Sequence, residues 1–302
     1  MLIETAIAVK SHKERTLFMR SKNSMLAVAM ILTVGAVACS SDLSGPPALS
    51  DVQVDADIAA TAGDAVASQI AGFANDVAAA GSFTIVSPSF NVNAPGSTAT
   101  GAPSFTAVSA TCSYSAGRYT CAATTEEGLT VSRSFAFYDA QGNTVQTFDP
   151  ATVESVNFQA QVDGNFQRDI VWSAGVHRTH NVTVSGLISQ APQRRWNGTG
   201  AGNDTISHIG LDGIRSLAGA AVDTVKQVVM PGPDAESQIP LSGSIVVAVD
   251  YTASLQGVTG TVSRDVKRKV TVTFNGTNDA SLEIGTLSCV LHLDTHAVDS
   301  CQ

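Results

Sequence analysis

The spacing of apolar residues divides the chain into a helical part and a β part. Over residues 51–81, apolar side chains recur every three or four positions, which predicts one amphipathic helix with its N-cap at Ser50 or Asp51. The apolar stripe is narrow and rich in alanine, so we expect the helix to pack on a sheet rather than to form a coiled coil. Its members are Val54, Ile58, Ala62, Val66, Ile70, Phe73 and Val77.

From residue 112 to residue 302 the apolar period becomes two. Short alternating segments are separated by turn residues, for example in 129–137, 156–162, 245–251 and 266–274. No helical segments alternate with them, which favours antiparallel pairing. The sequence therefore predicts a mainly β fold, either an antiparallel β-sandwich or a curved half-barrel-like sheet, with one N-terminal amphipathic helix.

Polar and glycine-rich stretches set the expected ends of the strands. Residues 139–143 and 163–165 are predicted to be turns, and the glycine-rich residues 198–202 a loop. The β-branched content of residues 222–230 favours a strand, with a short helix as the alternative. Residues 82–111 are rich in proline, serine and glycine and predict either a linker or weak edge strands.

The N-terminal part has the order of a secretory signal. Arg20 and Lys22 precede an unbroken apolar run over residues 25–38. The run is shorter than the stretch of about 20 residues that a membrane-spanning helix needs. It ends in small residues followed by a cysteine: Ala36, Val37, Ala38 and Cys39.

These four residues resemble the lipobox of bacterial lipoproteins, although Ala36 stands where that family usually has leucine. In that family the cysteine is diacylated and becomes the new N-terminus. The resemblance implies a signal peptide over 1–38, with Met19 as an alternative start, and a lipid anchor on Cys39 that holds a flexible tether over 39–50. The residue after the cysteine is Ser40 and not the aspartate that retains such lipoproteins in the inner membrane. The resemblance therefore implies sorting to the outer membrane. The resemblance does not extend to the β domain.

The charge balance argues against a nucleic-acid partner. The whole chain carries −9, but its first 38 residues hold five of the 17 basic and two of the 26 acidic residues, so the remainder carries −12. Because affinity for nucleic acid depends on neutralising phosphates, such a chain is not expected to bind it. The expected partners are the membrane, through the lipid, and an envelope protein or an amphiphilic ligand.

The cysteines favour an oxidising compartment. If Cys39 takes lipid, four cysteines remain, and a two-residue turn would place Cys112 opposite Cys121. Such a pair brings Cα atoms to about 4.5 Å, within disulfide range. Cys289 and Cys301 bracket a similar short turn, so two local disulfides are predicted. The alternative of one shared zinc lacks the closely spaced cysteine pairs of zinc sites.

Arginines that keep the period of the valines are the candidate ligand-binding residues. Arg133, Arg178 and Arg268, with Arg264, alternate with valine or phenylalanine, so they face the apolar side of their strands. A guanidinium there must reach a sheet edge, pair with an acid or line a wet cavity. Snorkelling and local pairing are the simpler alternatives to a ligand site.

The sequence contains no strong catalytic motif. The run over 198–202 lacks the lysine of a phosphate-binding loop. His292, Asp294 and His296 have the spacing of possible zinc ligands, but they fall in the expected turn between Cys289 and Cys301, which favours a solvated turn. We therefore predict no catalytic residue, metal or cofactor.

Three functions remain for a protein of this kind. The first is a non-enzymatic binding or structural module of the cell envelope, anchored in the outer membrane. The second is a carrier of a lipid or small amphiphile in a cavity covered by the helix, and the third is an envelope enzyme without a recognisable motif. An apolar cavity under the helix would favour the carrier.

Replacement of the predicted lipidated cysteine tests the anchor. Cys39→Ala is expected to accumulate as an uncleaved precursor, because the acyl chains can no longer be attached. Mass spectrometry of the wild-type membrane fraction should find an N-terminal lipopeptide that begins at Cys39. A soluble wild-type protein cleaved at another position would contradict this prediction.

Overall fold

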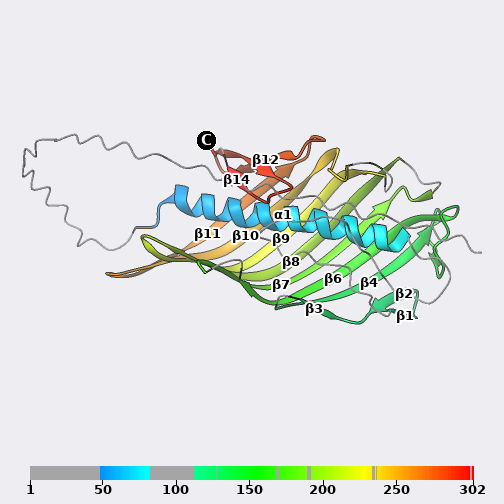
Figure 1. The fold of residues 1–302 in the computed structure, drawn as a ribbon, viewed down its shortest axis with the longest axis horizontal. Helices are drawn as coiled ribbons and strands as arrows, with labels where there is room; N and C mark the ends of the chain where they lie inside the picture. Colours follow the sequence, from blue (N-terminus) through cyan, green and yellow to red (C-terminus); the bar gives the residue numbers. More distant parts are fainter. Residues whose placement is uncertain are drawn as a thin grey trace, which may run out of the picture. The chain divides into compact units, whose positions relative to one another are not determined.

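One antiparallel sheet with a single helix across one of its faces makes up the described part of the chain (Figure 1). The computed structural model describes residues 48–81, 112–126, 128–167, 170–188, 192–232, 235, 237–299 and 301–302. The predicted signal peptide over 1–38, Cys39, most of the tether and the segment 82–111 lie outside these residues.

The strands follow the helix α1 (Asp51–Gly81) in a simple meander, in which each main strand pairs with the next one along the chain. Short β3 and β5 pair only with β4. The strands are β1 (Cys112–Ser115), β2 (Arg118–Cys121), β3 (Thr124–Glu126), β4 (Leu129–Asp139), β5 (Thr144–Val145), β6 (Val153–Gln167), β7 (Trp172–Ser185), β8 (Gln193–Gly210), β9 (Gly213–Pro231), β10 (Ser242–Gly257), β11 (Gly260–Thr273), β12 (Asp279–Ile284), β13 (Leu287–His292) and β14 (Val298–Asp299).

The described strands form a single curved sheet, so the curved-sheet form of the predicted fold is confirmed and the sandwich is not adopted. Strand β9, at 19 residues, covers the segment 222–230 and confirms the strand predicted there. The turn over 139–143 is also confirmed. The Asp139 carboxylate accepts hydrogen bonds from the backbone N–H groups of Gln141 and Asn143 at 3.0 and 2.8 Å.

The turn predicted over 163–165 and the loop predicted over 198–202 are both wrong, because β6 and β8 run through them. Gly164 has φ of 143°, and a Cβ atom at this position would overlap the carbonyl oxygen of Gly128. Glycine therefore allows two strands to approach each other closely here, rather than reversing the chain.

Helix α1 begins with a reciprocal cap. The backbone N–H of Gln53 donates to Ser50 Oγ at 3.2 Å, and the Gln53 side chain accepts from the Ser50 backbone N–H at 3.5 Å. Ser50 is thus the N-cap. The described residues of the predicted stripe are at most 6 % exposed: Val54, Ile58, Ala62, Val66 and Ile70. Phe73 and Val77 lie in α1, but their side chains fall outside the described residues.

The first half of α1 packs on the C-terminal strands β10–β12 and β14. Gly63 permits this close packing, because a Cβ atom there would lie 2.6 Å from Val298 Cγ2 and 3.2 Å from Leu291 Cδ1. Among the described residues, α1 does not combine the length and apolarity that a membrane crossing requires.

Both predicted disulfides are present. Cys112 and Cys121 are direct cross-strand partners in β1 and β2, with Cα atoms 3.9 Å apart. The turn between them has positive φ at Ala116, as the predicted two-residue hairpin requires. Cys289 and Cys301 form the second bridge, with Cα atoms 4.1 Å apart. The two bridges lie at opposite ends of the strand order.

A series of acidic residues attaches α1 to the sheet. Each acid meets a basic side chain of β9, β11 or the C-terminal segment. The pairs are Asp51 with Arg264 at 2.8 Å, Asp55 with Arg268 at 2.6 Å, Asp57 with Arg215 at 2.9 Å and Asp64 with His296 at 3.1 Å. The helix is therefore positioned by charge as well as by its apolar stripe.

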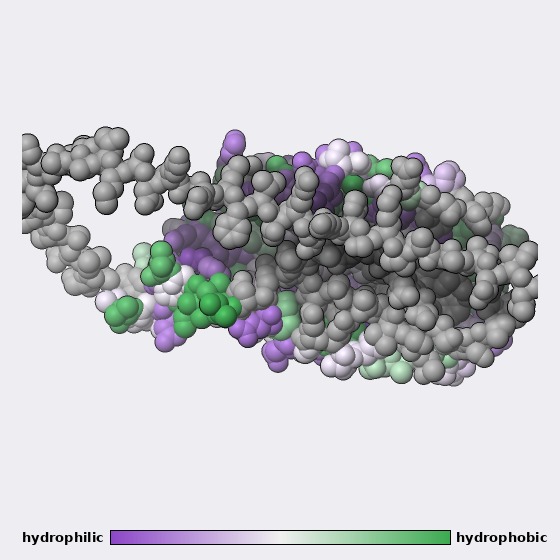
Figure 2. Space-filling model, viewed as in Figure 1, coloured by the Kyte–Doolittle hydropathy of each residue, from purple (hydrophilic) through white to green (hydrophobic). Residues whose placement is uncertain are grey.

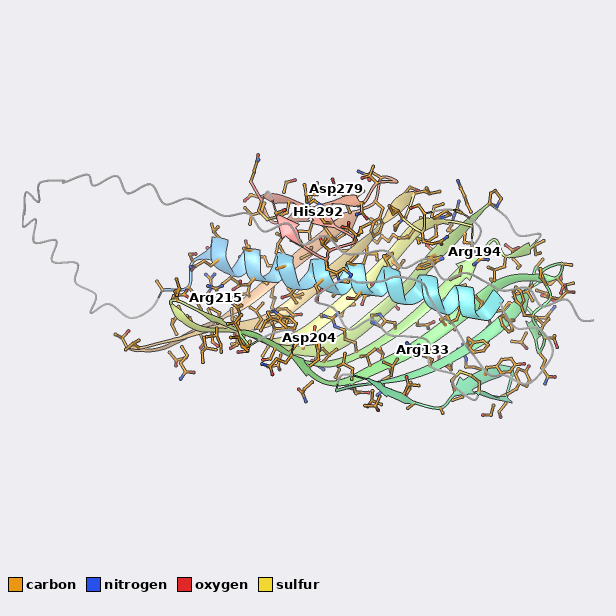
Figure 3. The ribbon with its side chains drawn as sticks, in the orientation of Figure 1. Arg133, Arg194, Asp204, Arg215, Asp279 and His292 are labelled. Carbon is orange, nitrogen blue, oxygen red and sulfur yellow. A yellow bond between two sulfur atoms is a disulfide. The ribbon has the colours of Figure 1, made fainter. Side chains whose placement is uncertain are left out.

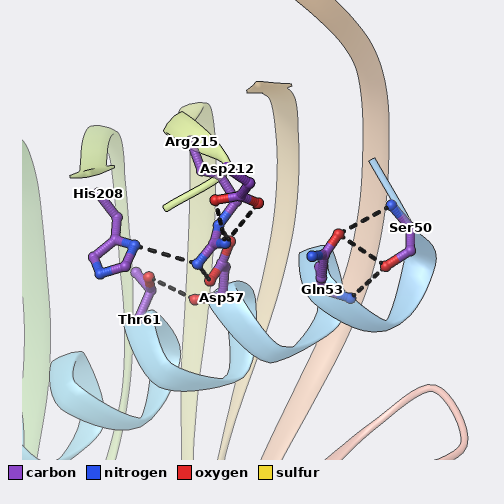
Figure 4. A network of polar contacts seen from close by, with 7 residues as sticks. All are labelled: Ser50, Gln53, Asp57, Thr61, His208, Asp212 and Arg215. Atoms are coloured by element: carbon purple, nitrogen blue, oxygen red, sulfur yellow. Dashed lines mark hydrogen bonds and ion pairs between the residues drawn. The ribbon is translucent and has the colours of Figure 1, made fainter. Parts of the chain in front are cut away.

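The pair between Asp57 and Arg215 belongs to a larger network (Figure 4). Arg215 also contacts Asp212 at 3.3 Å and His208 at 3.2 Å. Burial raises the pKa of Asp57 above its ordinary value, although the guanidinium of Arg215 opposes the shift. Asp57 therefore needs Arg215 to stay ionised in its partly buried position, whereas Arg215 has a second acidic partner in Asp212.

This asymmetry predicts unequal costs for the two halves of the pair. Arg215→Met should lower the free energy of unfolding by roughly 2 kcal/mol, because it leaves a partly buried carboxylate without its cation. Asp57→Asn should cost less than about 1 kcal/mol, since Arg215 keeps Asp212 as a partner. Urea unfolding measures both, with Asp212→Asn as the exposed control. Equal losses for the two variants would refute the asymmetry.

Candidate functional site

The middle of α1, from Thr61 to Gly72, and strands β4, β6, β7 and β8 line a partly open cavity of about 160 Å³ that we call the helix-side cavity. Its walls are mainly apolar, and Phe166 and Trp172 form one of them with ring centroids 5.2 Å apart. It is lined by Thr61, Asp64, Ala65, Ser68, Gln69, Gly72, Leu129, Val131, Arg133, Ala160, Val162, Phe166, Trp172, Ala174, Val176, Arg178, His180, Asp204 and Ile206.

A line of glycines on β8 makes room for polar side chains beside this cavity. Gly200 and Gly202 take the register positions that face the helix. A Cβ atom at Gly200 would overlap the Asp223 carboxylate and lie 2.5 Å from His180 Nδ1, and one at Gly202 would lie 2.7 Å from Arg178 Cγ. Residues 198–202, which were predicted as a loop, are thus the part of β8 against which a buried polar cluster packs.

The first part of this cluster is a fully paired arginine. Arg178 Nε and Nη2 donate to the two carboxylate oxygens of Asp204 at 2.9 and 2.6 Å, and the Tyr251 hydroxyl donates to Asp204 at 3.1 Å. Burial would lower the pKa of Arg178, but the hydrogen bonds and charge of Asp204 outweigh it and raise that pKa. Burial and the same carboxylate raise the pKa of Tyr251, so the hydroxyl remains a donor.

The second part of the cluster links the helix to β7 and β9. The Gln69 side-chain N–H group donates to His180 Nδ1 at 3.2 Å and to Asp223 Oδ2 at 3.1 Å. His180 Nδ1 lies 3.7 Å from Asp223 Oδ1. Burial lowers the pKa of His180, against the charge of Asp223, so the imidazole is neutral and can accept from Gln69 at neutral pH.

The three arginines chosen from the sequence have different surroundings. Arg133 and Arg178 both line the helix-side cavity, whereas Arg268 pairs with Asp55 and Asp51 at the start of α1. Figure 3 shows Arg133 and Asp204 on the same side of the helix, over neighbouring parts of the sheet. The structure therefore places Arg133 and Arg178 at the same cavity, whereas Arg268 forms ion pairs with the helix.

The possible zinc ligands do not converge. His292 bonds to Asp279 at 2.6 Å, and Figure 3 shows these two labelled residues next to each other. His296 instead contacts Asp64 and Ser68 of α1. His296, only 13 % exposed at its side chain, is therefore not part of a solvated turn. Within the described ranges, no three potential ligands are grouped for a metal ion.

The contacts of His296 also differ from those of a catalytic triad. Its Nδ1 atom faces both Asp64 Oδ1 at 3.1 Å and Ser68 Oγ at 3.4 Å. A triad needs the acid and the nucleophile on opposite ring nitrogens. The arrangement instead connects the turn after β13 to the helix.

Sequence reasoning did not identify His180, Asp204 and Asp223. Each precedes an inward apolar residue by two positions, namely Val182, Ile206 and Val225. The same period that selected the arginines would have selected them, once β8 was taken as a continuous strand. Gln69 carries no comparable signal, because a single glutamine on a helix is commonly exposed.

Comparison with protein-family models, curated proteins and solved structures gives no match to this chain. Functional conclusions for this protein therefore have to come from the chemistry of its own residues.

The buried state of His180 predicts a particular pH dependence of stability. Because its pKa is lower in the folded chain than the ordinary value of 6.5, the unfolded chain takes up a proton first as the pH falls. The free energy of unfolding should decrease as the pH drops below 6.5, and His180→Gln should make this decrease shallower.

His292 is the matched control. Its hydrogen bond to Asp279 raises its pKa, so its contribution is present at low pH and is lost as the pH rises through the folded-state value. His292→Gln should therefore make the free energy of unfolding decrease more steeply as the pH falls, the opposite of the effect of His180→Gln. Denaturant unfolding at a series of pH values measures both. An unchanged slope in His180→Gln would show that this imidazole does not titrate as inferred.

Proposed function

We propose that this chain is a lipid-anchored, non-enzymatic protein of the bacterial cell envelope that binds a small amphiphile in the helix-side cavity. The observation that carries the proposal is an apolar cavity between helix and sheet with a few converging polar groups, an arrangement typical of small-molecule sites. The lipobox residues at Cys39 and the two disulfides support the compartment, because disulfides persist in oxidising spaces.

The size of the cavity limits the ligand. Its volume of about 160 Å³ is close to that of a cavity of about 150 Å³ that accommodates benzene, and below the range of about 300 to 1,000 Å³ for drug-sized ligands. A whole diacyl lipid does not fit. The proposed occupant is one ring or one short acyl chain, with its head group at the mouth.

The proposed head group is anionic and lies near Arg133, because a guanidinium can add a carboxylate or phosphate to the contacts it already has; the acidic lining residues Asp64 and Asp204 each have a basic partner. Arg178 is neutralised by two hydrogen bonds to Asp204, so it adds little net charge. Arg133, on the β4 side, brings a guanidinium to the same cavity. Guanidinium groups recognise carboxylates and phosphates through paired hydrogen bonds.

A structural or protein-binding module is the second candidate, and the outer face of the sheet favours it. A groove of about 820 Å³ lies there, and hydroxyl and amide side chains such as Gln159, Asn181 and Thr199 follow one another across neighbouring strands. An envelope enzyme is the weaker alternative. His180 beside Asp223 would need a nucleophile to act on a substrate, and the side chain that joins the two, Gln69, ends in an amide, which is not a nucleophile.

Binding of octanoate and octanol tests the cavity and its charge separately. The wild-type protein should bind both, as measured by native mass spectrometry and calorimetry. Arg133→Gln should weaken octanoate by about tenfold and leave octanol unchanged, because one charged contact to the head group is lost. Val162→Trp should abolish binding of both, since the indole fills the cavity.

Arg268→Gln is the matched control, because this arginine faces the same side of the sheet but serves the helix. It should leave both affinities unchanged. Arg178 is unsuitable for substitution, since its loss would leave Asp204 as an unpaired buried carboxylate and would destabilise the fold. Failure of the wild type to bind either compound would end the proposal of an amphiphile site.

A further inference from the structure

Three successive turns at one end of the sheet carry apolar side chains in water. Ile170 lies between β6 and β7, Leu211 between β8 and β9, and Val258 between β10 and β11. Their exposures are 86 %, 111 % and 107 %, the highest among the large apolar residues that are exposed. Turns are usually built from glycine, proline, asparagine, aspartate and serine, so apolar residues in three of them require an explanation.

The strand register places these turns together. Trp172 at the start of β7 pairs with His208 near the end of β8, and Arg215 at the start of β9 pairs with Leu255 near the end of β10. The Ile209 backbone N–H also donates to the carbonyl oxygen of Val171 at 2.7 Å, directly joining the first turn to the second. All three turns therefore lie at the same ends of the neighbouring strands, on one side of the sheet.

Further exposed apolar residues surround the three turns. Ile209 and Ile214 flank Leu211 and are 50 % and 39 % exposed, and Val52 in the first turn of α1 is 67 % exposed. Hydrophobic surface gathers in Figure 2 at the end of the molecule from which α1 starts. We call this set of side chains the apolar tip: Val52, Ile170, Ile209, Leu211, Ile214 and Val258.

The contacts of α1 connect its N-terminal end to the strand ends that carry these turns. Asp57 bonds to Arg215, which also contacts Asp212 in the second turn. Asp51 pairs with Arg264, four residues after the start of β11. The chain thus enters the fold beside the apolar tip.

The length of chain before the helix indicates what covers this tip. Cys39 precedes Asp51 by twelve residues, and such a segment reaches at most roughly 40 Å even when fully extended. An acyl anchor on Cys39 would therefore keep the tip close to the bilayer.

We propose that the apolar tip inserts into the surface of the lipid bilayer and orients the sheet on the membrane. Exposed apolar side chains at loop ends gain free energy by leaving water for the boundary between head groups and acyl chains. The proposal adds an orientation to the anchoring part of the proposed function and does not depend on a ligand in the helix-side cavity.

Photo-crosslinking in native membranes tests the contact with the full-length protein. Benzoylphenylalanine placed at Leu211 or at Val258 should give covalent adducts with phospholipid, detected by mass spectrometry. The same probe at Val222 or Leu241 is the matched control, because these apolar residues are also exposed, at 50 % and 37 %, but lie away from the three turns. Neither control position should give a lipid adduct.

A charge variant tests whether the tip acts as a unit. With the probe at Ile170, the double substitution Leu211→Asp and Val258→Asp should abolish the lipid adduct, because the two carboxylates resist entry into the bilayer. The double substitution Val222→Asp and Leu241→Asp should leave it unchanged. The far-ultraviolet circular dichroism spectrum checks that each variant is folded.

The outcomes separate this proposal from the anchor and from the ligand site. Lipid adducts at Leu211 without a lipopeptide at Cys39 would support the tip and refute the anchor. An acylated Cys39 with no lipid adduct at either tip position would overturn the proposal, as would adducts to a protein instead of lipid, or equal adducts at Val222. Octanoate binding is independent of all these results.

Discussion

A charged side chain on the covered face of a sheet must find an opposite charge, and this requirement decides how the helix lies. Arg215, Arg264 and Arg268 all face the helix, and α1 supplies aspartates at matching positions. The apolar stripe alone, small and rich in alanine, would allow the helix to slide or rotate. The ion pairs define one position, which brings the first half of α1 onto β10–β12 and extends the second half over β4–β8.

The same requirement is met differently farther along the sheet, at Arg178. There the acid comes from the neighbouring strand as Asp204, and the glycines of β8 supply the volume that the paired side chains occupy. A bulkier residue at Gly200 would force Asp223 and His180 apart and thereby disturb the contact of both with Gln69.

The sequence allowed the helix, both disulfides and a mainly antiparallel β fold to be predicted, because each depends on local periodicity or short-range geometry. It left the N-cap open between Ser50 and Asp51, and the form of the fold open between a sandwich and a curved sheet. Glycine was the main source of error. Gly164 and Gly200 lie inside long strands, where the missing side chain lets neighbouring atoms come close. In the sequence, such a glycine cannot be distinguished from a glycine in a turn. Because residues 198–202 were predicted as a loop, Asp204 was not identified as the acid that pairs with Arg178. The aspartates of α1 could be seen, but which strand each would meet depends on long-range packing.

The location of the two disulfides matters for the behaviour of the sheet as a whole. An open sheet offers unpaired backbone groups on its first and last strands, and such edges invite pairing with another chain. Among the described strands, the outermost two are only four and two residues long, and a disulfide fixes the hairpin at each margin. The covalent bridges therefore hold the short hairpin at each margin in place, which hinders pairing of these margins with another chain. In this way they limit the growth of a many-stranded open sheet by pairing at its margins.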